Sequence, residues 1–511
     1  MSAEQNAPSQ KTIHPLKVCR LGIDTIDEAV IYMRKDCDVC RSEGFTSHAR
    51  VRVSNGAKSI IATLHQVTSD ILGPFDAGLS EVAWQHLDLG DGAEVTVSHP
   101  QPLDSLSIVR SKVYGHRLGG DALRSVIADV AAGRYSGIQL SSFITACSAR
   151  PLDLDETIGM TRAMVEVGDR LSWDRAPVVD KHSVGGLPGN RTSPIVVSIV
   201  AACGLTMPKT SSRAITSPAG TADMMETLAP VNLDLRAIRR VVEEEGGCIV
   251  WGGAVRLSPA DDIFIRVERV LDLDSEGQLV ASVLSKKIAA GSTHVVLDMP
   301  VGPTAKVRSR EAADALSLSL VEVARAFGLA VRVLTSDGTQ PVGRGIGPAL
   351  EALDVLAVLQ GSPDAPHDLR ERALTLAGAA LELGGASASG EGLDRARRVL
   401  ADGRAWTKFQ AICEAQGGLR QPPVAPHVEP VLATHGGHVT AADNRRLAKI
   451  AKLAGAPDAK AAGITLHVRL GEAVVKDQPL FSIHAETPGE LDYAKAFAQS
   501  NGDIIAVGVA P

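Results

Sequence analysis

Aromatic residues are scarce in this chain of 511 residues, in which Trp, Tyr and Phe together make up 3%. Hydrophobic residues still account for 45%, so the cores must be built mainly from Ala, Val, Leu and Ile. An excess of basic residues is also missing, because 52 Lys and Arg stand against 59 Asp and Glu. The net charge of −7 gives no footprint for binding a nucleic acid. The length exceeds that of a single core and predicts two to four domains.

Long apolar runs and a cysteine framework are absent too. No run approaches the roughly 20 apolar residues of a membrane span, and the polar start MSAEQNAPSQKT does not resemble a signal peptide. We therefore expect a cytoplasmic protein with no membrane partner. Seven scattered cysteines argue against a disulfide network. Cys37 and Cys40 form the one C-x-x-C; with no second pair, reduced thiols are favoured over a zinc site, although His48 could be a third ligand.

Neither a Walker loop nor a G-x-G-x-x-G turn is present, but residues 178–221 contain a different anion-binding pattern. A short apolar run at 177–179 leads into DKHSVGG, and RTS follows just before the apolar helix expected at 194–203. Glycines let the backbone approach a ligand, and a helix start favours negative charge. The loop adds a cation, Lys181, and hydroxyl donors. We interpret it as an anion site rather than a plain glycine-rich turn.

A second hydroxyl-rich stretch follows that helix. Residues 209–221, KTSSRAITSPAGT, hold six hydroxyls and two cations. Two loops separated by one helix can meet at the carboxyl ends of parallel strands, where open α/β sheets bind ligands. The pattern predicts one shared site for an anion, but not for a nucleoside triphosphate or a dinucleotide.

Hydrophobic periodicity predicts an α/β multidomain protein with four parts. A small β-rich N-terminal domain is expected over 1–100, with a short helix at 24–33. An all-helical domain is expected over 103–175, joined by part of 258–290. Strands and helices alternate over 177–427, which predicts a large α/β domain with a mainly parallel sheet. The last part, 428–511, has the pattern of a small β-rich unit.

Several blocks resemble the thymidine/pyrimidine-nucleoside phosphorylase family over roughly residues 105–511. They are DKHSVGG, RTS, SSRAITSPAGT, LSPADD (257–262) and ASVLSKK (281–287). The blocks IVWGGA (249–254), PADDIFIRVER (259–269) and MPVGPTAKV (299–307), with the extra N-terminal segment, are most similar to the AMP phosphorylase branch, also called type 2 thymidine phosphorylase.

The resemblance implies a pentosyltransferase of nucleotide salvage. Such an enzyme cleaves the N-glycosidic bond of a nucleotide or nucleoside with phosphate, giving a (deoxy)ribose 1-phosphate and free base. It implies no cofactor and no metal, since inorganic phosphate is a substrate, and it implies a homodimer or higher homo-oligomer in which the N-terminal domain is associated with assembly. Positioning and electrostatics are sufficient for this chemistry, because well-oriented reactants lower the barrier by about 7–11 kcal/mol.

Individual site residues follow from the same resemblance. His182, beside the phosphate, is expected to orient the sugar or the leaving group, and Asp274 is expected to protonate the leaving base, although it could equally be a turn residue. The expected phosphate contacts are Lys181, Ser183, Ser193, Ser212 and Thr221. The expected nucleotide and base contacts are Gly186, Ser212, Arg213, Ala214, Ile215, Thr216, Ser217, Thr221, Ser282, Lys286 and Lys306.

One departure bears on the substrate. Thymidine-preferring members carry an Arg in a block of the type L-R-D-x-T, whereas this chain has Glu268 near that position. A carboxylate repels the carbonyl groups of thymine, so an AMP-type 5′-nucleotide is the expected substrate, with thymidine as the alternative. A Mg²⁺-dependent enzyme resembling anthranilate phosphoribosyltransferase and a non-catalytic nucleotide-binding regulator are remoter alternatives.

Overall fold

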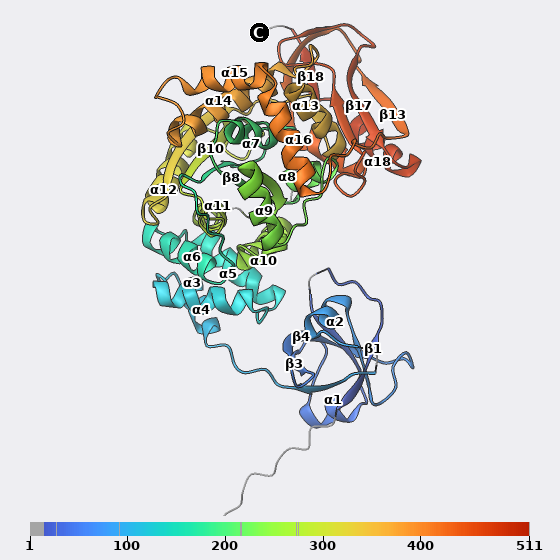
Figure 1. Cartoon of the computed structure of the whole chain (residues 1–511). Coiled ribbons are helices and arrows are strands. Elements are labelled where there is room, and N and C mark those ends of the chain that lie inside the picture. Colours follow the sequence, from blue (N-terminus) through green and yellow to red (C-terminus); the bar gives the residue numbers. More distant parts are fainter. Residues whose placement is uncertain are drawn as a thin grey trace, which may run out of the picture. The chain divides into compact units, whose positions relative to one another are not determined.

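The computed structural model describes residues 15–26, 28–90, 92–214, 217–271, 273 and 275–509. The chain divides into two compact units (Figure 1). The first unit is made of two segments, the residues up to Tyr114 and Ala128–Phe143. The second unit is made of Gly115–Ile127 and the residues from Ile144 onward.

A closed six-stranded barrel forms most of the first unit, in the order β1-β5-β2-β4-β3-β6. Side chains alternate along its strands: Val51 and Val53 are buried in the barrel, whereas Arg52 between them is exposed. The elements are β1 (Leu16–Arg20), β2 (Val30–Arg34), α1 (Asp38–Glu43), β3 (Arg50–Ser54), β4 (Ser59–Val67), β5 (Asp76–Leu79), α2 (Glu81–Leu87) and β6 (Glu94–Ser98).

The short helix predicted over 24–33 is wrong. Residues from Val30 onward form strand β2, which pairs parallel to β4 and antiparallel to β5. Ile31 and Met33 are fully buried in the barrel, so pairing on both sides and burial of this β-branched and apolar run outweigh its helical spacing.

Four helices follow the barrel: α3 (Ser105–Val113), α4 (Gly120–Ala131), α5 (Gly137–Ala149) and α6 (Leu154–Glu166). Helix α6 begins with a capping box, in which Asp153 accepts from the N–H of Glu156 and Glu156 accepts from the N–H of Asp153. The carboxylate of Glu156 also accepts from the backbone of Leu118 at 2.8 Å, which fixes the start of α4 against α6. Helix α6 packs closely on α11 (Glu276–Ala289), so the later segment joins this bundle.

The α/β part confirms the predicted parallel sheet. Strands β7 (Val179–Ser183), β10 (His294–Val301) and β11 (Ala330–Asp337) pair in parallel, as do β8 (Met207–Ser211) and β9 (Gly247–Trp251). A parallel bridge between Val178 and Thr206 connects the two groups. The helices are α7 (Ser193–Ala202), α8 (Thr221–Glu226), α9 (Leu235–Glu245), α10 (Pro259–Leu271), α12 (Arg310–Arg325), α13 (Pro348–Leu359), α14 (His367–Leu383), α15 (Gly392–Ala401) and α16 (Arg404–Gln416), with a 3₁₀ turn at Gly252–Val255.

The predicted strand at 177–179 is displaced in the structure. The strand is β7, and the polar residues Asp180, Lys181 and His182 lie inside it rather than in a loop after it. Likewise β8 takes up the start of the hydroxyl-rich stretch 209–221. Both strands bury charged side chains in ion pairs, and a hydrophobic pattern cannot reveal such strands.

Helix α7 is the centre of the main core. Its residues from Ser193 to Ala201 are all buried, and it packs against α14 and α16 (Figure 1). A helix that is apolar on all sides fits only such a position. Its first residue therefore sits at a fixed point beside the strand ends.

The C-terminal part is β-rich, as predicted. One sheet has the order β12-β15-β17-β13 and takes its strand β12 (Gly345–Ile346) from before α13; a second has the order β16-β14-β18. Helix α18, which no expectation covered, begins with a capping box between Thr487 and Glu490. The elements are β13 (His427–Leu432), β14 (Gly437–Ala442), α17 (Asn444–Leu453), β15 (Gly463–Leu466), β16 (Ala473–Val474), β17 (Pro479–Ala485), α18 (Pro488–Ser500) and β18 (Ile505–Gly508).

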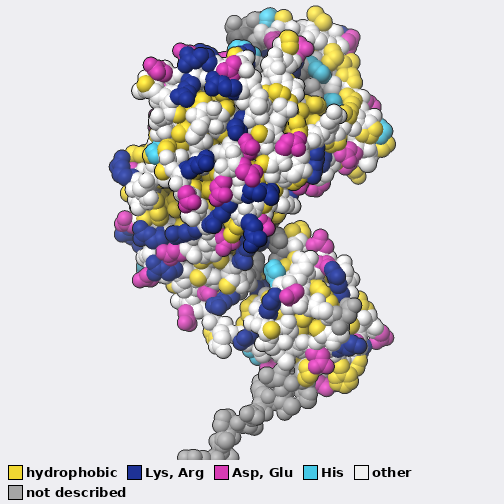
Figure 2. Space-filling model, in the orientation of Figure 1, with side chains coloured by type: hydrophobic (Ala, Val, Ile, Leu, Met, Phe, Trp, Pro, Cys, Tyr) yellow, Lys and Arg dark blue, Asp and Glu magenta, His cyan; other side chains and the backbone are white. Residues whose placement is uncertain are grey.

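Acidic and basic side chains are intermixed on the face of the larger unit drawn in Figure 2. Within the described ranges, no helix combines the length and the apolar character that crossing a membrane requires.

Candidate active site

Lys181, the cation expected to bind an anion, lies in β7. Its side chain is buried, and Nζ donates to Oγ1 of Thr192 at 2.7 Å. Thr192 is the N-cap of α7, but its hydroxyl makes no cap bond to the helix and serves the lysine instead. Burial lowers the pKa of Lys181 to about 8, assisted by Arg191 and opposed by Asp298. A buried ammonium thus stands at the start of α7, beside Ser193, and a bound anion would stabilise it.

Asp298 fixes the hydroxyl at the end of β7. Its carboxylate is fully buried and accepts from Ser183 Oγ at 3.1 Å and from Asn190 Nδ2 at 2.9 Å. Its other oxygen accepts from Ser336 Oγ on β11 at 2.6 Å. Because Asp298 lies directly opposite Ser183 in the sheet register, it holds that hydroxyl at the strand end.

A buried ionic cluster that the sequence did not predict lies in the same strands. Asp180 is inaccessible to solvent and pairs with Lys287 of α11 at 2.6 Å and with Lys209 of β8 at 3.4 Å. Lys209 Nζ also donates to the backbone oxygen of Thr210 at 2.9 Å. Burial lowers the pKa of Lys209 to about 7; Asp180 opposes this shift, and the positive charges of Lys287 and Lys181 add to it. The pair of adjacent lysines in SKK (285–287) is the feature of the sequence that could have indicated this cluster.

His182 is surrounded by positive charge. Burial and the ammonium groups of Lys287, Lys209, Lys181 and Lys286 hold its pKa well below the ordinary value. The ring is therefore neutral near pH 7 and can donate or accept one hydrogen bond, but it cannot supply a proton from an imidazolium. Lys181 and Lys209 belong to strands, while Lys286 and Lys287 belong to α11. Ammonium groups from both the sheet and the helix therefore lower the pKa of His182.

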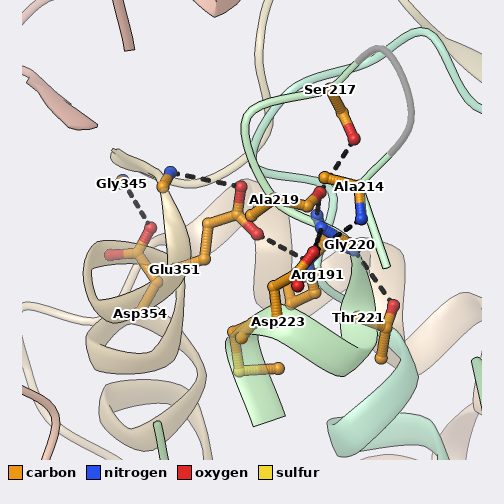
Figure 3. A network of polar contacts seen from close by, with 12 residues as sticks. Arg191, Ala214, Ser217, Ala219, Gly220, Thr221, Asp223, Gly345, Glu351 and Asp354 are labelled. Carbon is orange, nitrogen blue, oxygen red and sulfur yellow. Dashed lines mark hydrogen bonds and ion pairs between the residues drawn. The ribbon is translucent and has the colours of Figure 1, made fainter. Parts of the chain in front are cut away.

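Arg191 joins the two hydroxyl-rich loops (Figure 3). Its guanidinium donates to Thr221 Oγ1 at 3.0 Å and to the backbone oxygen of Ala219 at 2.9 Å. On its other side it pairs with the buried Glu351 of α13 at 2.6 Å. The sequence offered no signal for Glu351, which lies 160 residues away.

Asp223 of α8 closes the second loop on itself. Its Oδ2 accepts from the backbone N–H of Ala214 at 2.6 Å and of Gly220 at 2.8 Å, as Figure 3 shows. The backbone at Ala214 and at Gly220 is thereby fixed to the first turn of α8. Ser217 adds a bond from Oγ to the backbone oxygen of Ala219 at 2.9 Å, whereas Ser212 is exposed.

Arg213 is not a free cation in the structure. Its guanidinium binds both oxygens of Glu226, at 2.8 and 2.7 Å, and reaches Asp223 at 3.2 Å. It also lies over the ring of Trp251, 4.9 Å from the centroid. The residue expected to contact a nucleotide is thus neutralised by carboxylates 10 and 13 residues further along the chain.

The expected base contacts lie together on α11 and face α10. Ser282 Oγ donates to Asp261 at 3.0 Å, and Lys286 Nζ pairs with Asp261 at 2.8 Å and with Asp262 at 3.1 Å. Burial lowers the pKa of Lys286, but the two aspartates outweigh it, so the pKa lies above its ordinary value. The aspartates belong to the PADD block (259–262), and this acidic pair is the feature of the sequence that could have predicted a partner for Lys286.

Gly186 and Lys306 are neighbours. The glycine has φ +78°, and a Cβ there would lie 2.4 Å from the backbone nitrogen of Lys306. Only glycine fits this approach. Of the other expected contacts, Ile215, Thr216 and Asp274 lie outside the described residues.

Cys37 is the N-cap residue of α1, and Cys40 lies in the first turn of that helix. Cys37 Sγ accepts from the backbone of Cys40 at 3.3 Å, and both thiols are buried. All seven cysteines are free. Among the described residues, no group of three or more His, Cys, Asp or Glu is placed to hold a metal ion.

Comparison with known proteins defines the class. The chain matches a glycosyl transferase family a/b domain over 175–406, a glycosyl transferase family helical bundle domain over 106–168, and a pyrimidine nucleoside phosphorylase C-terminal domain over 438–504. The structure resembles anthranilate phosphoribosyltransferase from Thermus thermophilus, with a TM-score of 0.50 and 24% identity over 60% of this chain and 98% of that one, which shows a shared fold. The chain is a pentosyl-transferring glycosyltransferase.

Relatives over the full length show the family. A protein named "Putative thymidine phosphorylase 1" from Acidovorax sp. (strain JS42) is 65% identical over 96% of both chains. Two further relatives are named "Putative thymidine phosphorylase". The one from Polaromonas sp. is 62% identical over 98% of both chains, and the one from Legionella pneumophila strain Corby is 59% identical over 98% of this chain and 97% of that one. The chain belongs to the thymidine/pyrimidine-nucleoside phosphorylase family, as its motifs predicted.

Proposed function

We propose that this nucleoside phosphorylase acts preferentially on a nucleoside 5′-monophosphate of the AMP type. An oxygen of inorganic phosphate bonds to C1 of the ribose, the bond from C1 to the base nitrogen breaks, and its electron pair leaves with the base. The products are ribose 1,5-bisphosphate and free base. The observation that carries the phosphate chemistry is the buried Lys181, held at the start of α7 by Thr192.

Each group has a role in this scheme. Lys181 and Ser193 hold the attacking phosphate, with Ser183 fixed by Asp298 at the strand end. The neutral His182 orients the sugar, and Asp274 donates the proton that the leaving base takes up, a contribution of about 10²–10⁴-fold.

Ser282 and Lys286 provide the base contacts. Their pairing with Asp261 and Asp262 holds both donors on one face of α11. A lysine pinned by two carboxylates is less able to rotate away from its ligand, which supports a role in positioning.

Donors beyond the first phosphate site support the nucleotide preference. Arg213 lies two residues after the end of β8, and its planar fork suits phosphate oxygens. Ser211, at the end of β8, has a buried hydroxyl with no hydrogen-bond partner among the described residues. A second anion would use both. Glu268, in place of an arginine, disfavours thymine.

Thymidine is the second candidate, because Arg213 is already paired with Glu226 and Asp223. If that pairing persisted, the site would take a single phosphate and a nucleoside without one. The relatives' names point to the same substrate.

One assay separates the two candidates. The protein is incubated with phosphate and AMP, CMP, UMP, thymidine or uridine, and release of free base is measured. The proposal expects the highest specificity constant for a 5′-nucleotide, and a loss of that preference in Arg213→Ala. Asp274→Asn should lower kcat by about 10²–10⁴-fold if Asp274 is the acid. A higher specificity constant for thymidine, with a silent Arg213→Ala, would establish the thymidine reading.

We further propose that no cofactor takes part and that the enzyme is a homodimer or higher homo-oligomer. Full activity in EDTA separates it from a Mg²⁺-dependent phosphoribosyltransferase, which needs the ion to hold pyrophosphate. Sedimentation equilibrium of the purified chain measures the oligomer order.

A further inference from the structure

Among the described residues, the ion pairs around Arg213 join two cations and two anions. Besides Arg213, Glu226 and Asp223, they include Lys460, whose Nζ lies 3.1 Å from Glu226 Oε2 and 3.9 Å from Asp223 Oδ1. Glu226 is therefore shared between Arg213, which lies between β8 and α8, and a lysine from the C-terminal part. Its pKa is lowered to about 2, first by Arg213 and then also by Lys460, so the carboxylate stays ionised at neutral pH.

Lys460 is placed by backbone contacts, not by its own charge. Its carbonyl oxygen accepts from the N–H of Ala349 at 3.0 Å, at the start of α13. Two residues on, the backbone at Ala462 approaches so near to Gly347 that a Cβ on that glycine would lie 2.3 Å from the Ala462 oxygen. The segment before β15 is thus fixed to α13, and it holds the ammonium beside Glu226 and Asp223 of α8.

The four charged side chains differ in how far they are exposed and in how firmly they are held. Asp223 is 3% exposed and also binds two backbone N–H groups, so it cannot follow a moving partner. Arg213, Glu226 and Lys460 are each exposed by about a third, at 31%, 28% and 32%. Trp251 offers its ring face under the guanidinium, where a cation can shift without losing that contact.

An anion arriving at this loop would compete with Glu226 for Arg213. Two carboxylates that lose their arginine would otherwise repel the incoming phosphate. Lys460 already contacts Glu226, so it can neutralise that carboxylate when the guanidinium leaves. Asp223 retains its two backbone donors.

We propose that Arg213 exchanges Glu226 for the 5′-phosphate of a nucleotide, and that Lys460 is the positioning residue that retains Glu226 and makes the exchange possible. This inference rests on the proposed nucleotide preference. It assigns Lys460 and Glu226 to substrate selection, with Glu226 acting as an internal competitor of the phosphate.

The proposal predicts a specific pattern of coupling. Lys460→Met leaves Glu226 with Arg213 alone, so KM for AMP should rise about threefold to fivefold, the size expected of a partly exposed ion pair. Glu226→Gln removes the competitor, so KM for AMP should fall. In the double variant, Lys460→Met should have no further effect, because no carboxylate remains for it to retain.

Adenosine is the reference substrate, because it lacks only the 5′-phosphate. The ratio of kcat/KM for AMP to that for adenosine is measured in the wild type, the two single variants and the double variant. Lys460→Arg should restore the wild-type ratio, and Lys476→Met, a change at an exposed lysine of the same C-terminal part, should leave it as in the wild type. Thermal unfolding of each variant checks that folding is retained.

The outcomes distinguish a failure of the nucleotide preference from a failure of the Arg213 exchange. A wild-type ratio near one would overturn both the nucleotide preference and this exchange. A high wild-type ratio that Lys460→Met leaves unchanged would overturn the exchange alone. An effect of Lys460→Met that persists in the Glu226→Gln background would show that the lysine attracts the phosphate directly, and would also overturn it.

Discussion

Lys181 Nζ lies 2.7 Å from Thr192 Oγ1, so a strand residue of β7 is joined to the N-cap of α7 by one buried hydrogen bond. Among the residues that the structure describes, this neutral hydroxyl is the hydrogen-bond partner of the ammonium, and the bond places the ammonium where the helix start favours an anion.

Replacing this ammonium should weaken phosphate binding selectively. Charge-assisted hydrogen bonds contribute about 1.5–3 kcal/mol, so Lys181→Met should raise KM for phosphate by about 10- to 150-fold. Steady-state kinetics with each substrate varied in turn measures the effect. Thr192→Val is the matched control, since it removes the hydrogen bond but keeps the charge, and its effect should be smaller. An unchanged KM for phosphate in Lys181→Met would remove the lysine from the site.

Phosphate affinity should depend on pH. The pKa of Lys181, lowered to about 8 chiefly by burial, means that the ammonium is charged at pH 7 and mostly neutral at pH 9. KM for phosphate should therefore rise as the pH rises through 8, and this step should be missing in Lys181→Met. Lys209, whose pKa is lowered to about 7, is the other lysine that titrates nearby. The same step in the variant would assign it to Lys209.

His182 should not produce a step in the pH profile. With its pKa held well below the ordinary value of 6.5 by burial and four lysines, the ring stays neutral from about pH 6.5 upward. His182→Gln should lower kcat/KM while leaving the shape of the profile parallel to that of the wild type over this range. A limb near pH 6.5 that the variant loses would show that an imidazolium takes part.

Asp298 should contribute to both stability and phosphate binding. Asp298→Ala leaves the Asn190 amide and the hydroxyls of Ser183 and Ser336 without their acceptor. Each buried donor left unpaired costs about 1–3 kcal/mol, so the free energy of unfolding should fall by at least that amount. Urea unfolding measures it, with Asp314→Ala, at an exposed aspartate of α12, as control. Equal stabilities of the two variants would contradict the organising role of Asp298.

The sequence was informative wherever alternation or motifs signalled structure. The parallel α/β sheet followed from the strand and helix alternation, and the two hydroxyl-rich loops were placed at strand ends, where Arg191 joins them. Helix α18 could have been found from the capping pair Thr487 and Glu490. The barrel strand β2 could not, because its pairing with β4 and β5 is a tertiary effect.

The rest of the site depends on partners far apart in sequence. Asp298, Glu351 and Lys460 reach the loops from 108, 160 and more than 200 residues away, and no spacing rule predicts such contacts. The ion pairs of Asp180 also explain why the sequence predicts a loop from residue 180 onward, since a buried polar strand has no hydrophobic pattern.

Transfer of isotope-labelled phosphate tests the central claim most directly. The protein is incubated with AMP and phosphate labelled in its oxygen atoms, and the sugar product is analysed by mass spectrometry. The account predicts a sugar 1-phosphate that carries the label, formed together with free base and only when phosphate is present. Release of base at the same rate without phosphate, or an unlabelled sugar product, would contradict phosphorolysis.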